Sequence, residues 1–371
     1  MSRPTTKDLA RVAGVSRATV DRVLNGREGV KTKTIDKVNA AIKEIGFVRN
    51  ISAANLSKGK SYRFLFVLPK SGDLFLAEIL RHVEEAKTVF AADMVRTDVH
   101  HVDENDPHKI AVFLATLSSD DLDGVAIMAP QTPQVRDAIM RLQERGVPAL
   151  SFISNQSISD MEWVGIDNIA AGETAATLLG RFSQVRLGKI LVVSETMQSR
   201  DSLERRRGFD WVLNTTFPHL EALPSLETYG SEDRARAIIS AALSNNTDII
   251  GAYVLSSEAR APVAVLTEIF VPPHFVALAH ERTPFTEEAL RKGSLDAVIT
   301  QDTGHLVRSA IRKLRAKTDM RDTLNSQERI RIEMSMLSQA FSQMPLLWVS
   351  IILLAMITCW TQMPDLTTTI R

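Results

Sequence analysis

Residues 5–59 constrain this chain more than any other part of its sequence. They begin with two short amphipathic runs that meet at a turn containing Gly14. Thr5 and Asp8 match a capping box before the first run, and Ser16 stands where a second helix needs its N-cap. Apolar positions at helical spacing let the two runs pack together. These positions are Leu9, Val12, Ala13, Val15, Thr19, Val20 and Val23. The pattern predicts an all-α helix-turn-helix.

Positive charge is concentrated in the first 63 residues. They hold about 14 Lys and Arg against about 5 Asp and Glu, roughly +9, and the whole chain balances 44 against 44, so the remainder carries roughly −9. A basic segment on an acidic body is the electrostatic footprint of a nucleic-acid-binding protein. A helix-turn-helix places the start of its second helix at base edges in the major groove. Here that start holds Arg17 and Ala18, with Arg22 one turn later. The alternative, a plain surface helical hairpin, leaves the charge separation unexplained.

This stretch resembles the lactose-repressor (LacI) family of bacterial transcription regulators. A third helix is expected at 34–46, with apolar residues at helical spacing. Asp21 departs from the family pattern, in which Ser is commonest at this position. An acidic side chain there opposes contact with the DNA phosphates. The matching residues are Lys7-Asp8-Leu9-Ala10, Ala13-Gly14-Val15-Ser16, Thr19-Val20, Arg22-Val23-Leu24-Asn25, the helix stripe Ile35, Val38, Ala41, Ile42 and Ile45, and the runs 46–50 and 51–59.

The resemblance implies a role in DNA binding for several residues. In the family, the run at 51–59 is a hinge helix that folds when the dimer meets its operator. Its leucine, here Leu56, wedges between base steps in the minor groove and kinks the duplex. The DNA contacts implied position by position are Thr5, Ser16, Arg17, Ala18, Thr19, Arg22, Asn25, Asn50, Ala53 and Leu56.

From residue 62 onward, apolar runs alternate with longer amphipathic stretches. This alternation indicates βαβ units, that is, parallel sheets with helices on both faces. Two successive series predict two similar α/β lobes, and the cleft outside the strands' carboxyl ends is the natural ligand site. Strands are expected at 64–68, 92–99, 124–128 and 147–152, and then at 189–193, 222–229, 249–255, 275–279 and 297–300. Helices are expected at 74–91, 107–118 and 133–145 in the first series.

The family resemblance extends over this body. Its effector core is similar to a periplasmic sugar-binding protein, with crossings between lobes near 165–167 and 300–302. Asp167-Asn168-Ile169-Ala170-Ala171-Gly172 matches the family's Asp-Asn…Ala-Gly segment, and Arg205-Arg206-Arg207-Gly208-Phe209 matches its Arg-x-x-Gly-Phe. Asp167 and Arg205 would hold effector hydroxyls by charge-assisted hydrogen bonds, and Phe75 would cover a sugar face. The effector contacts implied by position are Phe75, Asp167, Arg205, Ser257, Glu281 and Gln301.

Each assignment has a structural alternative. Asp167 can cap a helix that begins at Asn168. Arg205 can pair with Glu204 or Asp201 at the surface, and Phe75 can fill the core. The family often has Asn-Asp near Ser256 and Ser257, so the contact from Ser257 rests on a weaker match.

No catalytic motif accompanies these residues. The chain lacks Gly-x-Ser-x-Gly, a P-loop and His-Glu-x-x-His. His100, His101, Asp103 and His108 form the densest group of metal-ligand types, which we interpret as a solvated loop. His280 with Glu281 has the composition of an acid–base pair, but no nucleophile or metal set accompanies it. A single cysteine, Cys359, excludes a disulfide framework. We predict no catalytic residue, metal or cofactor.

The C-terminal segment is atypical. Family resemblance stops at Glu333, and residues 334–371 contain an uncharged run at about 344–360. Trp348 and Trp360 flank most of this run. Interfacial tryptophans are typical of membrane spans, although roughly 20 residues are usually needed. Three interpretations stay open: a membrane-spanning helix, an apolar helix buried in a dimer or against the core, or an end altered by a change of reading frame.

The expected organisation is therefore a DNA-binding head at 1–49, a hinge helix and linker at 50–61, a two-lobed core at 62–333 and an apolar C-terminal helix within 334–371. The expected protein is a homodimeric repressor that binds a pseudo-palindromic operator in double-stranded DNA and senses a sugar or related polyol. Without an N-terminal signal segment, it is expected in the cytoplasm at the nucleoid, with inner-membrane attachment through the tail left open. The alternative is a membrane-tethered sugar-binding sensor without regulatory DNA binding.

Overall fold

The computed structural model describes residues 4–24, 29–45, 47, 61–70, 72–159, 161–183, 186–269, 275–321, 323 and 329–336. The chain divides into two compact units, a head of residues 1–61 together with 90–95, and a body of the rest. Four of the DNA contacts implied by the family, Asn25, Asn50, Ala53 and Leu56, lie outside the described residues. So does the apolar run at 344–360.

The head is a three-helix unit, as predicted. Its helices are α1 (Thr6–Ala13), α2 (Arg17–Leu24) and α3 (Thr32–Ile45). Gly14 ends α1 in the left-handed region at φ 63°, a conformation that costs glycine little, and this allows the tight turn into α2. The helices share one core, formed by Leu9, Ala10, Ala13, Val20, Val38, Ala41 and Phe47.

The first part of the body is lobe 1, a five-stranded sheet with helices on both faces. Strands β1, β3, β4 and β5 pair in parallel, in the sheet order β2-β1-β3-β4-β5. Its elements are β1 (Tyr62–Pro69), α5 (Leu74–Val89), the 3₁₀ turn η1 (Ala91–Asp93), β2 (Val95–Val102), α6 (Pro107–Thr116), β3 (Gly124–Ile127), α7 (Pro133–Glu144), β4 (Ala149–Phe152) and β5 (Glu162–Val164).

Lobe 2 repeats this design with a seven-stranded sheet. Six of its strands follow the order β12-β11-β10-β9-β6-β7, and the seventh, β8, pairs with β6. Only β12 runs antiparallel, against β11. Its elements are α8 (Asn168–Phe182), β6 (Gly188–Ser194), α9 (Arg200–Thr216), β7 (Leu220–Ala222), β8 (Leu226–Glu227), α10 (Glu232–Asn245), β9 (Ile249–Val254), α11 (Arg260–Glu268), β10 (Val276–His280), α12 (Pro284–Lys292), β11 (Ala297–Thr300) and β12 (Glu333–Ser335).

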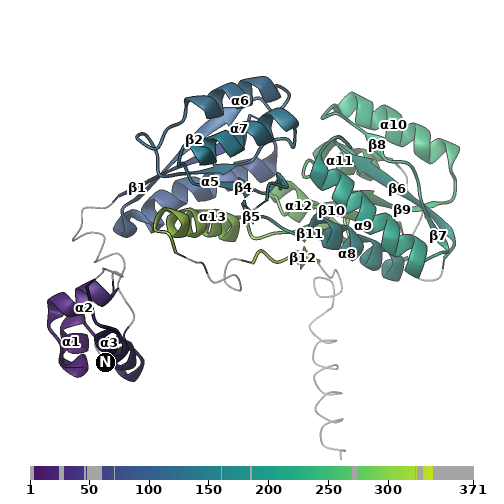
Figure 1. Cartoon of the computed structure of the whole chain (residues 1–371). Coiled ribbons are helices and arrows are strands. Elements are labelled where there is room, and N and C mark those ends of the chain that lie inside the picture. Colours follow the sequence, from purple (N-terminus) through teal and green to yellow (C-terminus); the bar gives the residue numbers. More distant parts are fainter. Residues whose placement is uncertain are drawn as a thin grey trace, which may run out of the picture. The chain divides into compact units, whose positions relative to one another are not determined.

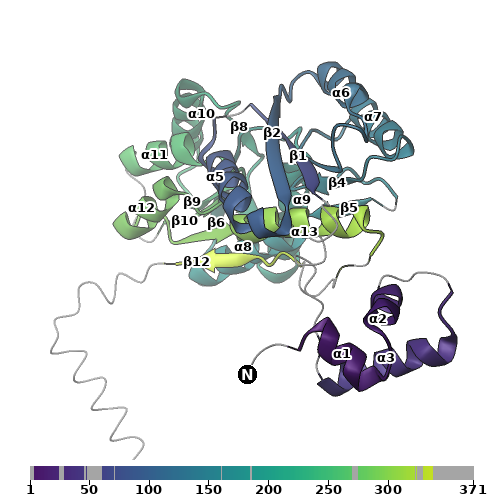
Figure 2. The same ribbon diagram turned by 90° about the vertical axis from the view of Figure 1, so that its left-hand side faces the viewer.

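The chain crosses between the lobes where the family pattern predicts. Residues 165–167 lead from β5 in lobe 1 to α8 in lobe 2. Residues 301–302 lead from β11 back to α13 (Thr303–Thr318), which packs beside α5 and on the sheet of lobe 1 (Figures 1 and 2). The chain then returns to β12 in lobe 2. The segments at 165–167 and 301–302 each join one lobe to the other, so a change in the angle between the lobes must bend them.

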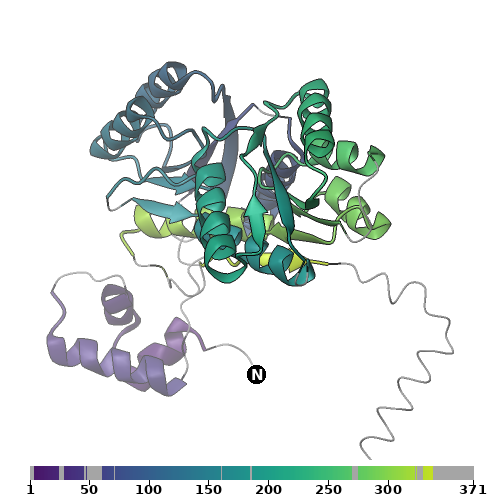
Figure 3. The same ribbon diagram turned by 90° about the vertical axis from the view of Figure 1, so that its right-hand side faces the viewer.

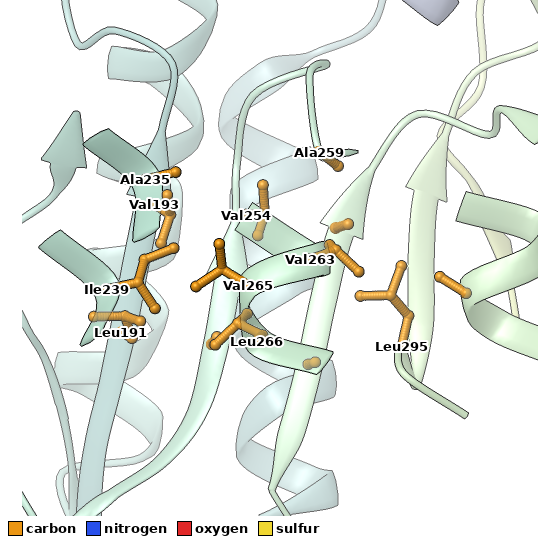
Figure 4. Close-up of a cluster of buried hydrophobic side chains, with 14 of the residues drawn as sticks. Leu191, Val193, Ala235, Ile239, Val254, Ala259, Val263, Val265, Leu266 and Leu295 are labelled. Atoms are coloured by element: carbon orange, nitrogen blue, oxygen red, sulfur yellow. The ribbon is translucent and has the colours of Figure 1, made fainter. Parts of the chain in front are cut away.

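Each lobe is a layered α/β unit, and the blue and teal lobes are distinct in Figure 3. In lobe 1, α6 and α7 cover one face of the sheet, and α5 and α13 cover the other. In lobe 2, α10, α11 and α12 cover one face, and α8 and α9 pack together on the other. Figure 4 shows how aliphatic side chains from α10 and α11 meet the strands of lobe 2.

Four strands differ from the sequence prediction. The strand expected at 92–99 begins only at Val95, because residues 91–93 form a 3₁₀ turn and Met94 takes a left-handed conformation at φ 59°. The strand expected at 222–229 is divided into β7 and β8 around Pro224, which has no N–H for the ladder. Strand β5 was not predicted. Nor was β12, which begins at Glu333, the residue at which the family resemblance stops.

Within the described residues, no helix is both long and apolar enough to cross a membrane.

Candidate functional site

The second helix of the head presents the predicted recognition face. Val20 is fully buried against the other helices, whereas Arg17, Ala18 and Arg22 are exposed. Asp21, which departs from the family pattern, is exposed on the same helix. Burial of one side of α2 therefore leaves both guanidinium groups on the side that can meet a nucleic acid.

Both predicted caps of the head are present. The Thr5 side chain accepts from the Asp8 backbone N–H at 3.3 Å, and the Thr5 N–H donates back to Asp8 Oδ2 at 2.9 Å. Hydrogen bonds from Thr5 hold the pKa of Asp8 below its ordinary value. Ser16 Oγ accepts from the Thr19 N–H at 3.1 Å and lies 2.8 Å from Thr19 Oγ1. These bonds define where both helices begin, and so fix the turn that presents Arg17.

In the body, three predicted effector residues form one buried network centred on Arg205. Its Nη2 donates to Glu281 Oε1 at 3.1 Å, and its Nη1 donates to the Leu255 carbonyl at 2.8 Å. Gln301 Nε2 donates to the same Glu281 oxygen at 3.0 Å. Leu255, Glu281 and Gln301 directly follow the carboxyl ends of the neighbouring strands β9, β10 and β11. The network thus lies at the edge of lobe 2 where open α/β sheets bind ligands.

The alternative that Arg205 forms a surface ion pair is wrong. Arg205 is only 4% exposed. Glu204 pairs instead with Arg200 at 2.6 Å, and Asp201 receives a hydrogen bond from Ser154 at 3.3 Å. Arg205 therefore belongs to the interior of the site.

Asn168, to which sequence reasoning gave no role, orients this arginine. Asn168 is buried at the start of α8, and its Oδ1 accepts from Arg205 Nε at 2.8 Å. It reaches Arg205 because α8 and α9 approach closely at two glycines. A Cβ on Gly172 would lie 1.9 Å from the Arg205 carbonyl oxygen, and one on Gly208 would lie 2.0 Å from that of Ile169. The two family motifs, of which the first contains Gly172 and the second Gly208, therefore pack directly against each other.

Glu281 combines a charge partner with incomplete hydrogen bonding. Its carboxyl is 1% exposed, and Oε2 has no hydrogen-bond partner among the described residues. Burial raises the pKa of Glu281 to about 6 despite the lowering effect of Arg205 and Gln301. An unpartnered buried acceptor is costly, so Oε2 is the unsatisfied acceptor of this network.

Protonation of Glu281 predicts a pH dependence of stability. Its pKa rises from 4.5 to about 6 on folding, so the stability that it contributes is complete below pH 4.5 and is lost as the pH rises through 6. We expect wild-type protein to lose about 2 kcal/mol of unfolding free energy across this range relative to Glu281→Gln. Urea unfolding at pH 4.5 and 6.5 measures the difference, and parallel pH profiles would contradict the assignment.

The remaining predicted effector residues do not join the network. Asp167 is exposed and caps α8 through the Ala170 N–H at 3.1 Å, as its structural alternative predicted. Asp302 caps α13 in the same way after the second crossing. Phe75 is 3% exposed at the start of α5. Their roles toward an effector stay predictions.

Ser257 instead spans the lobes. Its Oγ donates at 3.3 Å to Oδ2 of Asp73, which precedes α5 in lobe 1. Arg200 in lobe 2 likewise donates to Ser157 in lobe 1. Near the first contact, burial raises the pKa of Glu195, and the neighbouring carboxylates Asp73, Glu104 and Glu258 raise it further. Acidic side chains of both lobes therefore lie near the contact between Ser257 and Asp73, a feature that separate sequence segments did not reveal.

The residues considered for catalysis or metal binding have other partners. His280 accepts or donates a hydrogen bond with the Tyr253 hydroxyl at 2.7 Å, whereas Glu281 bonds to Arg205 and Gln301. His100 stacks on Phe113. Among the residues that the structure describes, no group of three or more His, Cys, Asp or Glu is arranged to hold a metal ion.

Comparison with known families assigns both units of the chain. Residues 5–50 match the family described as bacterial regulatory proteins, lacI family. Residues 64–320 match the periplasmic binding protein domain. The two matches leave residues 51–63 between them unmatched, so the hinge and linker expected at 50–61 stay a prediction.

Similar proteins include regulators of this kind. Catabolite control protein A of Staphylococcus xylosus is 28% identical over 164 residues, which cover 44% of this chain and 48% of that protein. The HTH-type transcriptional regulator RegA of Clostridium saccharobutylicum is 32% identical over 174 residues, or 47% of this chain and 50% of that one. The chain thus matches about half the length of these relatives.

Solved structures share the fold of the body. The glucose-galactose binding protein GanP of Geobacillus stearothermophilus has a TM-score of 0.65 at 15% identity, and covers 77% of this chain and 100% of its own. A LacI transcriptional regulator structure from Bacteroides fragilis has a TM-score of 0.65 at 18% identity, and covers 75% and 97% respectively. The periplasmic binding protein match covers most of the chain, so the chain belongs to the periplasmic binding protein domain family, and its head matches the model of bacterial regulatory proteins, lacI family.

Proposed function

We propose that this protein is a sequence-specific DNA-binding transcriptional regulator, a homodimeric repressor, whose operator affinity is controlled by a sugar-like effector bound between lobes 1 and 2. One observation carries the proposal: a lacI-type head with an exposed recognition helix is joined in one chain to a two-lobed binding body. DNA as the target places the protein in the cytoplasm at the nucleoid.

On the DNA side, Arg17, Ala18 and Arg22 face base edges and phosphates from α2. Arginine and lysine contacts to phosphate supply most of the affinity and make it fall steeply with salt, while base contacts supply sequence preference. Two heads in a dimer read the two halves of a pseudo-palindromic operator. Exposure of these three side chains supports this arrangement.

On the effector side, the Arg205 network supplies polar groups at the carboxyl ends of β9, β10 and β11. Glucose-galactose binding by the protein named GanP, which shares this fold, favours a sugar or polyol as the ligand class. Effector that changes the lobe angle bends the crossings at 165–167 and 301–302 and shifts the balance between DNA-bound and free states.

The head assignment predicts a salt-dependent effect of Arg22→Ala. Loss of one phosphate-neutralising cation is expected to weaken DNA binding and to lower the slope of log K against log salt by about 1. Fluorescence anisotropy with a duplex at several salt concentrations measures this slope. Arg207→Ala, which removes an exposed charge from α9 in the body, serves as the matched control. Equal slopes in wild type and Arg22→Ala would contradict the assignment.

Selection of duplexes from a random library by the full-length protein tests the proposed function as a whole. The expected result is enrichment of a pseudo-palindrome that is retained by wild type, is lost with Arg17→Ala, and is retained more or less tightly when a sugar is added. Recovery of no common sequence would overturn sequence-specific regulation. Recovery of an operator that responds to no sugar or polyol would overturn only the effector class.

A further inference from the structure

A cavity of about 430 Å³ lies where the second crossing joins the lobes. We name it the hinge pocket. It shares only Gln301 with the six effector residues expected from the family. The residues that line it are Glu78, Arg81, His82, Arg282, Thr283, Pro284, Glu287, Thr300, Gln301, Asp302, Thr303 and Glu333.

Both lobes contribute walls to the hinge pocket. Glu78, Arg81 and His82 lie on α5 of lobe 1. From lobe 2, Arg282 and Thr283 precede α12, and Pro284 and Glu287 lie in its first turn. The crossing at 300–303 forms a further wall. Anything that occupies the pocket therefore contacts both lobes and the segment that must bend when their angle changes.

The charged groups of the pocket are largely paired with one another. Arg81 Nη2 lies 2.7 Å from Glu78 Oε2, and Arg282 Nε lies 2.5 Å from Glu287 Oε1. Asp302 accepts from the His305 N–H at 2.7 Å and lies 3.7 Å from Arg308. A strongly charged ligand would have to break such pairs. A neutral ligand with several hydroxyls can donate to the carboxylates and accept from the guanidinium groups without breaking them.

Gln301 adds a specific requirement. It is 4% exposed, its Nε2 donates to Glu281 at 3.0 Å, and its Oε1 has no hydrogen-bond partner among the described residues. Oε1 is an amide carbonyl oxygen, so it can only accept a hydrogen bond. The unpartnered oxygen belongs to the crossing segment that lines the pocket, and a ligand hydroxyl that reached it would remove the cost of an unpartnered buried acceptor.

The rest of the lining excludes an apolar ligand. Pro284 is the only lining residue without a polar side chain, and three threonines, Thr283, Thr300 and Thr303, contribute hydroxyls. The lining contains no Phe, Tyr or Trp that could stack on a flat ligand. The volume falls within the range of about 300–1,000 Å³ that small-molecule sites occupy.

We propose that the hinge pocket is a second ligand site, separate from the Arg205 network, which binds a neutral polyhydroxylated molecule of about the size of a monosaccharide. Its hydroxyls donate to the carboxylates and to the lining threonines, and accept from Arg81 and Arg282. Because the pocket joins both lobes, occupancy favours one lobe angle. Its effect on DNA affinity, but not the binding itself, rests on the proposed regulatory function.

Site-specific cysteine protection tests this proposal. Thr303→Cys reports on the hinge pocket and Ser257→Cys on the cleft near the effector residues, each in full-length protein with Cys359→Ser. Thr216→Cys, exposed at the end of α9, is the control. The rate of alkylation by iodoacetamide is measured against the concentration of D-ribose, D-glucose, xylitol, sorbitol and myo-inositol. At ten times the Kd of a bound polyol, alkylation of Cys at 303 is expected to slow about tenfold, with the control unchanged.

The protection curves separate the outcomes. Protection at position 303 with a Kd different from that at 257, or protection at 303 alone, supports a separate site. Protection of 257 alone, or of both positions with one common Kd for every polyol, overturns the second site and leaves the cleft effector standing. No protection at 303 by any polyol also overturns it, whatever the library selection shows for DNA binding. If Thr303→Cys does not fold, Glu78→Cys on the opposite wall takes its place.

Discussion

Gly208→Ala is expected to lower the unfolding free energy of the body by about 3 kcal/mol or more. The added Cβ would lie 2.0 Å from the Ile169 carbonyl oxygen of α8, and the closest atoms belong to backbone that no rotamer change can move. Helices α8 and α9 must therefore separate. Their separation would also pull Asn168 away from Arg205, so effector binding is expected to be lost even in protein that stays folded. Thermal unfolding and sugar binding measure the two effects.

Gly172→Ala offers an independent test, because its Cβ would lie 1.9 Å from the Arg205 carbonyl oxygen on the other side of the same contact. Gly72→Ala is the matched control, since no atom lies within 4 Å of its added Cβ. Wild-type melting temperatures for both Gly172→Ala and Gly208→Ala would show that α8 and α9 are not in this close contact.

Arg205→Met is the second change with a large expected effect, a loss of about 3–5 kcal/mol of unfolding free energy at pH 7.5. It removes the cation beside the buried Glu281 and leaves Asn168 Oδ1 and the Leu255 carbonyl without their donor. Without Arg205 the pKa of Glu281 rises further, so the variant regains stability as the pH falls more strongly than wild type does. Response to effector is expected to disappear, while DNA binding by the head persists.

A double-mutant cycle tests whether the uncompensated charge of Glu281 causes the loss of stability in Arg205→Met. Adding Glu281→Gln to Arg205→Met removes the uncompensated charge, so it is expected to restore part of the lost stability, whereas Glu281→Gln alone has a smaller effect. Additive free-energy changes would mean that the two side chains do not interact. Arg206→Met is the control, because its guanidinium pairs with Asp210 in a less buried setting on the same helix. An effector response that survives Arg205→Met would refute the effector assignment.

The head was the most predictable part of the chain, because its determinants are local. Thr5 caps a helix whose partner Asp8 is three residues away, and Gly14 supplies the turn. Most residues of the apolar stripes that predicted the helices lie in or against the observed core, except Thr19 and Ile35. Strand β5, by contrast, has only three residues, two of them half-buried, and its pairing with β4 makes it a strand.

In the body, the family resemblance assigned Arg205, Glu281 and Gln301 to the effector site. The structure shows that Arg205 and Gln301 both donate hydrogen bonds to Glu281. Arg205 and Glu281 are 76 positions apart in the chain, and Arg205 and Asn168 are 37 apart. Periodicity carries no information on such pairs. Asn168 belongs to the Asp-Asn dipeptide of the family motif, which drew attention to this position. The residue types alone do not say which of the two, Asp167 or Asn168, contacts Arg205.

The sequence by itself determined the class of each unit: a basic helix-turn-helix head, two series of alternating strands and helices, and the two crossings between lobes. The head and the alternating series follow from caps, turns and apolar periodicity, which act over a few residues, whereas the positions of the crossings came from the family resemblance. Only the tertiary structure decided that Asp167 caps a helix while Asn168 holds Arg205, that Ser257 reaches Asp73 across the lobes, and that α5 and the second crossing enclose a polar pocket. Such contacts join strand ends and helices distant in the chain, because burial in a packed fold, and not local spacing, brings them together.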